Sequence, residues 1–364
     1  MKKSLHFGLY IGLSLFAAAC ASSDQSQVDS SSRFTEKVLQ GEAQGTTWTV
    51  RYLNDTTDYS AEFTALLKAI DRDLSTYLPG SLINQVNAHN RTDTVFAFHD
   101  STQYFSVMFE HSRLIWETTE HAFDPTVYPL VELWGFGLTN RAAVDSAEVE
   151  RRLAWVGMQP ANIDLIEVMR DSYIYEQTQI RKGNANVKLD FNAIAQGFTV
   201  DLMADLLKSK NIDNFMVELG GEVYCHGVNS KGEPWRIAID QPISEGERQF
   251  QAVASVTNRA ICTSGNYRKF YEENGQRYAH FIDPRTGYPV SHTLLSATVM
   301  ATSAAAADAY ATACMVMGLE ATIEFLRTHP ELNLEVYLIY DEAGTFKTWM
   351  TEGMKGLIEE VAQS

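Results

Sequence analysis

Two short segments of the chain carry side chains suited to phosphate chemistry with a hard metal ion. HFIDPRTG (280–287) contains an imidazole, a carboxylate and a guanidinium, and AAAADAYAT (304–312) adds a carboxylate and a hydroxyl. Imidazole exchanges protons near neutral pH, whereas carboxylate and hydroxyl oxygens are ligands that Mg²⁺ prefers. Together they predict a site for a phosphate-bearing cofactor and a metal ion.

Asp308 and Thr312 give the most specific signal for a metal site in these segments. They stand four residues apart in an alanine-rich run of high helix propensity, so their oxygens fall on one face of a helix, one turn apart. Such a pair can chelate a cation, although an Asp and a Thr on a helix face are often simply solvated. Because the flanking alanines favour close packing, we expect Asp308 to be enclosed and to need a metal ion or hydrogen-bond donors.

The N-terminus predicts export and lipid anchoring. Two lysines precede an apolar run (5–19) that ends in small residues before Cys20, as in a secretory signal peptide, and AAAC resembles a bacterial lipobox. We therefore expect a signal peptide at 1–19, lipidation of Cys20 and a flexible, serine-rich tether over 20–33. An uncleaved anchor and ordinary secretion are the alternatives. The functional domain is expected over 34–364.

Composition excludes several classes of function. The 364 residues include 46 acidic and 29 basic side chains, giving a formal net charge of −17, so binding of nucleic acid through counterion release is not expected. Beyond Cys20 the chain has Cys225, Cys262 and Cys314, without a CxxC pair. This pattern indicates neither a disulfide framework nor a zinc site, and we expect three buried thiols.

Hydrophobic periodicity predicts an α+β fold without a regular strand–helix alternation. Apolar residues at helical spacing follow Ser60 as far as Tyr77, and Asp145 is expected to cap a helix that Gly157 closes. The helix capped by Asp145 is predicted at 147–156, and the other predicted helices are 103–118, 195–209, 304–317 and 319–328. Strands are predicted at 45–53, 173–180, 186–190, 215–219, 235–240, 250–257, 278–282, 294–301 and 334–341.

Two glycine-containing segments could let main chain approach a phosphate. The sequence has neither a GxGxxG nor a GxxxxGK[ST] motif, which excludes the commonest dinucleotide and triphosphate cradles. LGGE (219–222) and TSGNYR (263–268) place Gly where backbone amides can come close to an anion. Taken alone, each segment reads more readily as an ordinary turn, because Gly is the default turn residue.

Across most of the body the chain resembles the ApbE family, the FAD:protein FMN transferases. The matching segments follow in order along the chain: GTTW (45–48), LSTYLPGS (74–81) with Asn87, HAFDPTVYPLVELWGFG (121–137), LDFNAIAQGFTVD (189–201), VELGGEV (217–223), TSGNYR (263–268), HFIDPRTGYPV (280–290) and ADAYATA (307–313). The resemblance implies one large, two-lobed domain with mixed β-sheets and flanking helices.

The resemblance also implies a reaction. FAD, bound with Mg²⁺, would be attacked at its pyrophosphate by a Ser or Thr hydroxyl of an exported or membrane flavoprotein, leaving FMN as a phosphoester and releasing AMP. Acceptors would be subunits of sodium-pumping or Rnf-type electron-transfer complexes, with a D-[GA]-x-[ST]-[GA]-A-T-like motif. Two alternatives are an FAD pyrophosphatase, with water as acceptor, and a non-catalytic flavin-binding lipoprotein.

By the family's pattern the metal is held by the Asp308 carboxylate, the Thr312 hydroxyl and the main-chain carbonyls of Ala193 and Ala311. His280 is the implied general base, since neutral imidazole can take the hydroxyl proton. His292 and His121 are rival candidates, and a histidine buried in the core is the structural alternative.

The FAD contacts implied by the resemblance surround these groups. Tyr77 also reads as a core residue at a helix end, and Arg285 as part of a turn or as a phosphate partner. Gln44 stands where the family often has Met. The full set of implied FAD contacts is Tyr77, Ala122, Phe123, Asp124, Asp190, Gln196 and Ile282.

The family's location is the periplasmic side of a bacterial membrane. The inner membrane is its usual site. The outer membrane stays open for this chain, because Ala21 follows Cys20 where inner-membrane lipoproteins often have Asp.

Overall fold

A computed structural model describes residues 34–136, 144–171, 174–243, 249–266, 270–273, 276–279 and 281–361. The described residues from Phe34 onward belong to one compact unit. The predicted signal peptide, Cys20 and the tether lie outside the described residues. Over the part that is described, no helix combines the length and apolar character needed to cross a bilayer.

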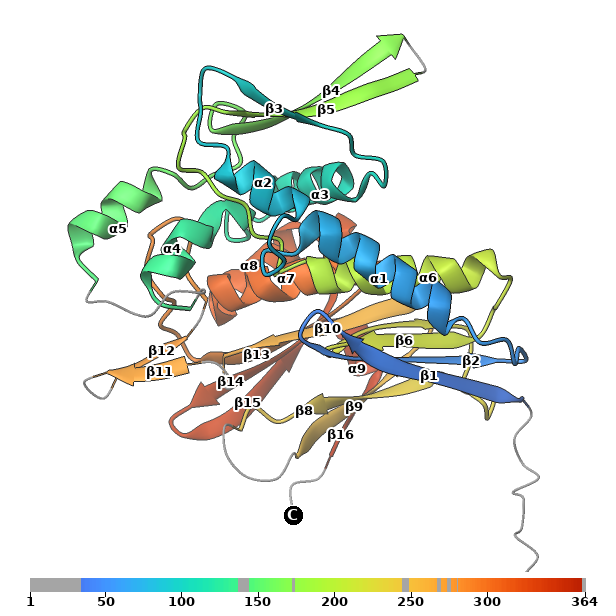
Figure 1. Cartoon of the computed structure of the whole chain (residues 1–364). Helices are drawn as coiled ribbons and strands as arrows, with labels where there is room; N and C mark the ends of the chain where they lie inside the picture. Colours follow the sequence, from blue (N-terminus) through green and yellow to red (C-terminus); the bar gives the residue numbers. More distant parts are fainter. Residues whose placement is uncertain are drawn as a thin grey trace, which may run out of the picture. The chain divides into compact units, whose positions relative to one another are not determined.

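The centre of the fold is an eight-stranded sheet in which every pairing is antiparallel (Figure 1). Its order is β1-β2-β6-β7-β10-β13-β14-β15. The strands are β1 (Glu36–Ala43), β2 (Thr46–Leu53), β6 (Phe215–Leu219), β7 (Glu222–His226), β10 (Arg259–Gly265), β13 (Leu294–Ala301), β14 (Glu335–Glu342) and β15 (Thr345–Met350).

The two faces of this sheet pack against different layers. On one face, residues such as Val217 and Val299 join the main core with α1 (Ser60–Leu74), α6 (Ala195–Ser209) and α7 (Ala304–Met317). On the other face, alternate residues such as Met300 and Tyr337 pack with a three-stranded sheet, as the period of two along a strand requires. That sheet is ordered β16 (Ile358–Glu360), β9 (Phe250–Val256) and β8 (Trp235–Asp240).

The remaining elements complete the body around these layers. A third sheet, ordered β3-β5-β4, lies beside α2 and α3 in Figure 1. The bounds are β3 (Val95–Phe98), β4 (Ile163–Asp171), β5 (Ile174–Lys182), β11 (Phe270–Glu273), β12 (Gln276–Ala279), α2 (Leu82–Ala88), α3 (Tyr104–Thr118), α4 (Tyr128–Leu133), α5 (Ser146–Leu153), α8 (Leu319–Thr328) and α9 (Glu352–Lys355), with 3₁₀ turns at Pro125–Val127 and Pro330–Leu332.

The α+β class is confirmed, and several predicted elements have the observed bounds, among them α6, α7, α8, β6, β8 and β13. Asp145 caps α5 through the amide of Ala147, as predicted, but this helix ends at Leu153. The three cysteines are free and buried, as expected.

Three local predictions are wrong. Residues 186–190 form no strand, because the Asn87 side chain bonds both the amide and the carbonyl of Leu189 and so replaces a strand partner. The strand predicted at 278–282 ends at Ala279 in β12, and Ile282 forms an isolated bridge with Pro289. TSG in TSGNYR is the end of β10, paired with β13, and is not a turn.

Candidate functional site

The site begins where α6 crosses α7. The amide of Gly197 donates a hydrogen bond of 3.1 Å to Oδ2 of Asp308. A Cβ on Gly197 would lie 2.2 Å from the carbonyl oxygen of Ala304, so the two helices approach closely only because residue 197 has no side chain. The crossing therefore fixes the Asp308 carboxylate against the first turn of α6.

Asp201, one turn further along α6, fixes the start of α7. Its two carboxylate oxygens accept the amides of Ala304 at 2.7 Å and Ala305 at 2.9 Å. These are first-turn amides without partners inside the helix, and a carboxylate there complements the helix dipole. Burial raises the pKa of Asp201 to about 6. Asp201 thus sets the position of the helix that carries Asp308 and Thr312.

Asp308 is enclosed, as its alanine-rich surroundings predict. Only 7% of the surface of Asp308 is exposed, and burial raises the pKa of its carboxyl to about 7. Thr312 follows one turn later, partly buried, with its Oγ1 3.3 Å from Oγ of Ser264 on β10. The reading of these residues as a solvated surface pair is wrong. Of the other two implied metal positions, Ala311 is buried on the same helix and Ala193 lies two residues before α6.

Glu222, the first residue of β7, is a second enclosed carboxylate nearby. It is 8% exposed, and its Oε2 has no hydrogen-bond partner among the described residues. Burial, then the charge of Asp308, raises the pKa of Glu222 well above its usual value. A Cβ on Gly220 would lie 3.0 Å from Nε2 of Gln196 and 3.3 Å from Oε2 of Glu222, so both side chains face the Gly220–Gly221 turn.

These groups fit a hard cation. The donor set at Asp308 and Thr312 consists of oxygens, and Glu222, whose Oε2 has no hydrogen-bond partner among the described residues, adds a further carboxyl group in the same region. Within the described ranges no three side chains of His, Cys, Asp or Glu gather closely enough to hold a metal by themselves. A hydroxyl and main-chain carbonyls would therefore have to complete the coordination, which is usual for Mg²⁺ rather than for zinc.

A second group forms where the chain after α3 meets the segment before α6. The amide of Asp190 donates to the carbonyl of Pro125 at 2.8 Å, and the Asp190 carboxylate accepts the amide of Asn192 at 2.9 Å. Burial raises the pKa of Asp190 to about 6. Partial desolvation of the phenol and the charge of Asp190 raise the pKa of Tyr77, so these two predicted FAD contacts lie near each other.

Tyr77 is not a core residue at a helix end. The helix α1 ends at Leu74, and Tyr77 lies beyond it with 66% of its surface exposed. Its accessible aromatic ring is available to a ligand, as a flavin contact requires.

Asp124 is buried at the start of the 3₁₀ turn. Its Oδ1 accepts the amide of Thr126 at 2.7 Å and the hydroxyl of Thr126 at 2.5 Å. Burial nevertheless raises its pKa to about 7. Ala122 and Phe123 are buried in the core, with 1% and 2% of their surface exposed.

Ile282 and Arg285 lie in a turn that packs on α4. The Ile282 side chain is buried with Leu130 and Trp134, and the Trp134 indole donates to the carbonyl of Gly287 at 2.8 Å. Arg285 pairs with Asp283 at 2.9 Å, which supports its reading as part of the turn.

The structure describes two of the three candidate histidines. His280 lies outside the described residues. Nε2 of His292 lies 2.8 Å from the carbonyl of Met315, and its ring packs beside Gly318, so His292 supports the end of α7. The exposed His121 ring stacks on Trp116 with centroids 3.9 Å apart.

Gln44, at the position that departs from the family, donates to the Thr199 hydroxyl of α6 at 2.8 Å.

Sequence reasoning did not single out Asp201 or Glu222. Asp201 had a detectable signal, since an acid in α6 can cap the first turn of a neighbouring helix. Glu222 had a weaker one: it directly follows two glycines at the start of a strand whose other residues are mostly apolar.

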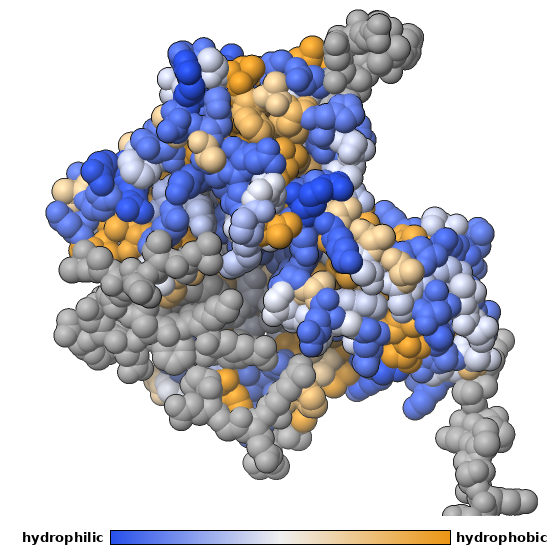
Figure 2. Space-filling model, in the orientation of Figure 1, coloured by the Kyte–Doolittle hydropathy of each residue, from blue (hydrophilic) through white to orange (hydrophobic). Residues whose placement is uncertain are grey.

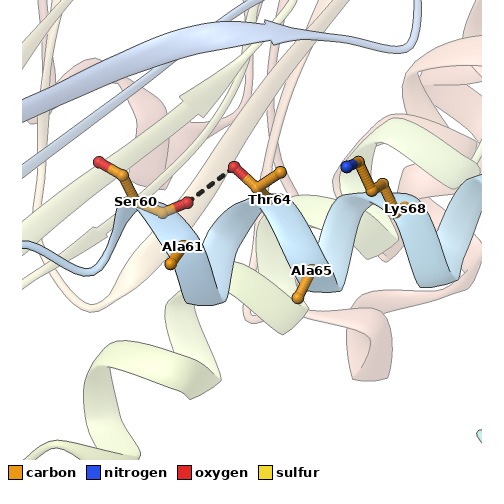
Figure 3. Close-up of a pocket in the computed structure, with 5 residues that line it drawn as sticks. All are labelled: Ser60, Ala61, Thr64, Ala65 and Lys68. Carbon is orange, nitrogen blue, oxygen red and sulfur yellow. Dashed lines mark hydrogen bonds between the residues drawn. The ribbon is translucent and has the colours of Figure 1, made fainter.

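A separate depression on the surface lacks the chemistry of this site. A shallow depression on α1 is lined by Ser60, Ala61, Thr64, Ala65 and Lys68, and Thr64 bonds within the helix to the carbonyl of Ser60 (Figure 3). These side chains include no acid or imidazole. Figure 2 shows hydrophobic residues in several separate areas of a mainly hydrophilic face.

Comparisons with known proteins identify the family. The sequence model described as "ApbE family" matches residues 44–338. The chain is 35% identical to the FAD:protein FMN transferase of Haemophilus influenzae, over 99% of both chains, and 33% identical to that of Escherichia coli K12, over 96% of both. The solved flavin transferase ApbE from Vibrio cholerae superimposes with a TM-score of 0.75 at 32% identity, covering 89% of this chain and 99% of that one. The chain belongs to the ApbE family.

Proposed function

We propose that this protein is a Mg²⁺-dependent FAD:protein FMN transferase. The observation that carries the proposal is the enclosed Asp308 carboxylate, held at the α6–α7 crossing with the Thr312 hydroxyl one turn away. The names of the aligned relatives support the transfer of FMN from FAD to a protein. The product is FMN joined by a phosphoester bond to a Ser or Thr of an exported or membrane flavoprotein.

Binding of FAD is assigned to residues around the two groups of the site. Tyr77 offers an exposed ring, and Asp190 and Gln196 offer polar groups on either side of the segment that leads into α6. Ala122, Phe123, Asp124 and Ile282 complete the proposed contacts. These positions would hold the pyrophosphate near Asp308.

The metal is proposed to bind at Asp308, Thr312 and the main-chain carbonyls of Ala193 and Ala311. A bound Mg²⁺ would supply positive charge for the pyrophosphate and for the departing AMP. The protein's own part is to hold the Asp308 carboxylate in place through the Gly197 amide and the α6–α7 packing.

His280 is proposed as the general base. It takes the proton of the acceptor hydroxyl while that oxygen forms a bond to the phosphorus of the FMN moiety. The bond from this phosphorus to the AMP oxygen breaks, and AMP leaves with the electron pair. Acceptors are proposed to carry a D-[GA]-x-[ST]-[GA]-A-T-like motif.

We also propose that Cys20 is lipidated and that the enzyme works on the periplasmic side of a bacterial membrane. The tether over 20–33 contains no group that the reaction needs. A protein that begins at Phe34 is therefore expected to retain activity toward a soluble acceptor.

The experiment uses the protein that begins at Phe34, together with FAD, Mg²⁺ and an acceptor protein. One version of the acceptor has Thr at the Ser/Thr position of the motif, and the other has Ala there. A fluorescent flavin band on the Thr version alone, with AMP released, is the expected result. AMP release that is independent of the acceptor would identify a pyrophosphatase. Flavin binding without AMP would identify a non-catalytic flavin carrier.

A further inference from the structure

We propose that Glu222 belongs to the cation site and supplies a second negative charge to the metal held by Asp308 and Thr312. This inference rests on the proposed function, because it concerns the metal of the same site. It gives Glu222, at the start of β7, a role in the metal site in addition to the roles of Asp308 and Thr312 on α7.

The burial of Glu222 favours a positive partner for its ionised form. Only 8% of the residue is exposed, and Oε2 is enclosed without a hydrogen-bond partner among the described residues. Enclosing a carboxylate in this way is costly unless a cation or a donor faces it. Pairing of Glu222 with Leu219 across the Gly220–Gly221 turn holds the backbone at the start of the strand in place.

The surroundings of Glu222 make a cation the suitable partner. Among the described residues, the side-chain charges that act on it come from Asp308 and Glu218, and both are negative. Two carboxylates that repel each other in a poorly hydrated place are stabilised together by one bound metal ion. Because no three such side chains converge, Glu222 completes a site that also uses hydroxyl and main-chain oxygens, either directly or through water.

Gly220 keeps the space beside Glu222 open. A Cβ there would crowd Cγ2 of Thr46 at 2.9 Å as well as the Gln196 and Glu222 side-chain ends. The missing side chain leaves the Glu222 carboxylate and the Gln196 amide facing the same turn. An acid with a purely structural role would instead be expected to bond a neighbouring donor.

The test measures Mn²⁺ binding by calorimetry, with and without FAD, for four proteins: wild type, Glu222→Gln, Glu218→Gln and Asp308→Asn. Glu218→Gln is the matched control, because it removes the same charge from the other side of the turn, where Glu218 accepts the Gly221 amide at 3.0 Å. A second readout is the rise in unfolding temperature on addition of Mg²⁺.

Glu222→Gln is expected to weaken Mn²⁺ binding at least tenfold and to lose most of the Mg²⁺-dependent rise in unfolding temperature. Its metal-free unfolding temperature should equal or exceed that of wild type, whereas Glu218→Gln should bind within twofold of wild type. If Glu222→Gln fails to fold, Glu222→Asp replaces it, because this variant keeps the negative charge. Glu222→Asp must then retain Mn²⁺ binding, whereas Asp308→Asn must lose it.

Two results would overturn the inference, and they are distinguishable. Wild-type Mn²⁺ affinity in Glu222→Gln, with binding lost in Asp308→Asn, would remove Glu222 from the site and leave the proposed metal function standing. Absence of Mn²⁺ and Mg²⁺ binding in the wild type, with and without FAD, would reject the metal site as a whole.

Discussion

The amide of Gly197 and the carboxylate of Asp308 are joined by a hydrogen bond of 3.1 Å that connects the first turn of α6 to the second turn of α7. This bond satisfies an amide that has no partner within its own helix, and it orients the carboxylate that we assign to the metal. Helix packing and the proposed chemistry are therefore linked at one point, and a change in either residue should affect both.

Gly197→Ala should destabilise the fold and impair the site. The new Cβ would lie 2.2 Å from the Ala304 carbonyl oxygen, so α6 and α7 would have to separate. We expect a loss of about 1–3 kcal/mol in the free energy of unfolding, measured by denaturant titration. Gly356→Ala is the control, because its Cβ meets no atom within 4 Å. Equal stability of both variants would contradict the close helix crossing.

Asp124→Asn should reduce the pH dependence of stability in the FAD-free protein. Burial raises the pKa of Asp124 from 3.8 to about 7. The stability that such a raised pKa contributes is fully present below pH 3.8 and is lost as the pH rises to about 7, where the buried carboxyl ionises. The wild type should therefore lose on the order of 2–4 kcal/mol over this range from Asp124 alone.

The measurement is the free energy of unfolding at several pH values between about 4 and 7. In Asp124→Asn the decline with rising pH should be smaller by that amount, because the amide does not ionise. Glu117→Gln, an exposed acid on α3, should leave the wild-type decline unchanged. Parallel curves for wild type and Asp124→Asn would show that Asp124 ionises normally in the fold.

His280→Ala should slow transfer without weakening FAD binding, because the proposed work of this residue is to remove a proton from the acceptor. We expect the rate of FMN transfer to fall by about 10²–10⁴. The FAD dissociation constant, measured by fluorescence titration, should stay within about twofold. His111→Ala, on the exposed face of α3, serves as the control. A rate near wild type would transfer the role of base to another group.

The sequence predicted best those elements whose signals are local. The bounds of α7 followed from an alanine-rich run that begins after Ser303, and the Ser303 side chain does accept the Ala306 amide. The enclosure of Asp308 also followed, because an acid between alanines must pack against its neighbours.

Features that depend on distant residues were not predictable. Residues 186–190 look like a strand, yet Asn87 takes the backbone groups of Leu189 from about a hundred positions away. The strand that contains Thr263 and Ser264 is defined by its pairing with β13 and not by its own composition. Glu222 looked like part of a glycine turn, and only the fold brings Asp308 close enough for its charge to act on Glu222.

The central claim is that Asp308 holds the cation required for FMN transfer, and Asp308→Asn tests it most directly. Asn keeps the size of the side chain and an oxygen for the Gly197 amide but removes the charge. With FAD, Mg²⁺ and a motif-bearing acceptor, covalent flavin on the acceptor should form at least about 10²-fold more slowly than in wild type. Asp205→Asn, an exposed acid on α6, should remain at the wild-type rate. Transfer by Asp308→Asn at the wild-type rate, with the wild-type dependence on Mg²⁺, would contradict the account.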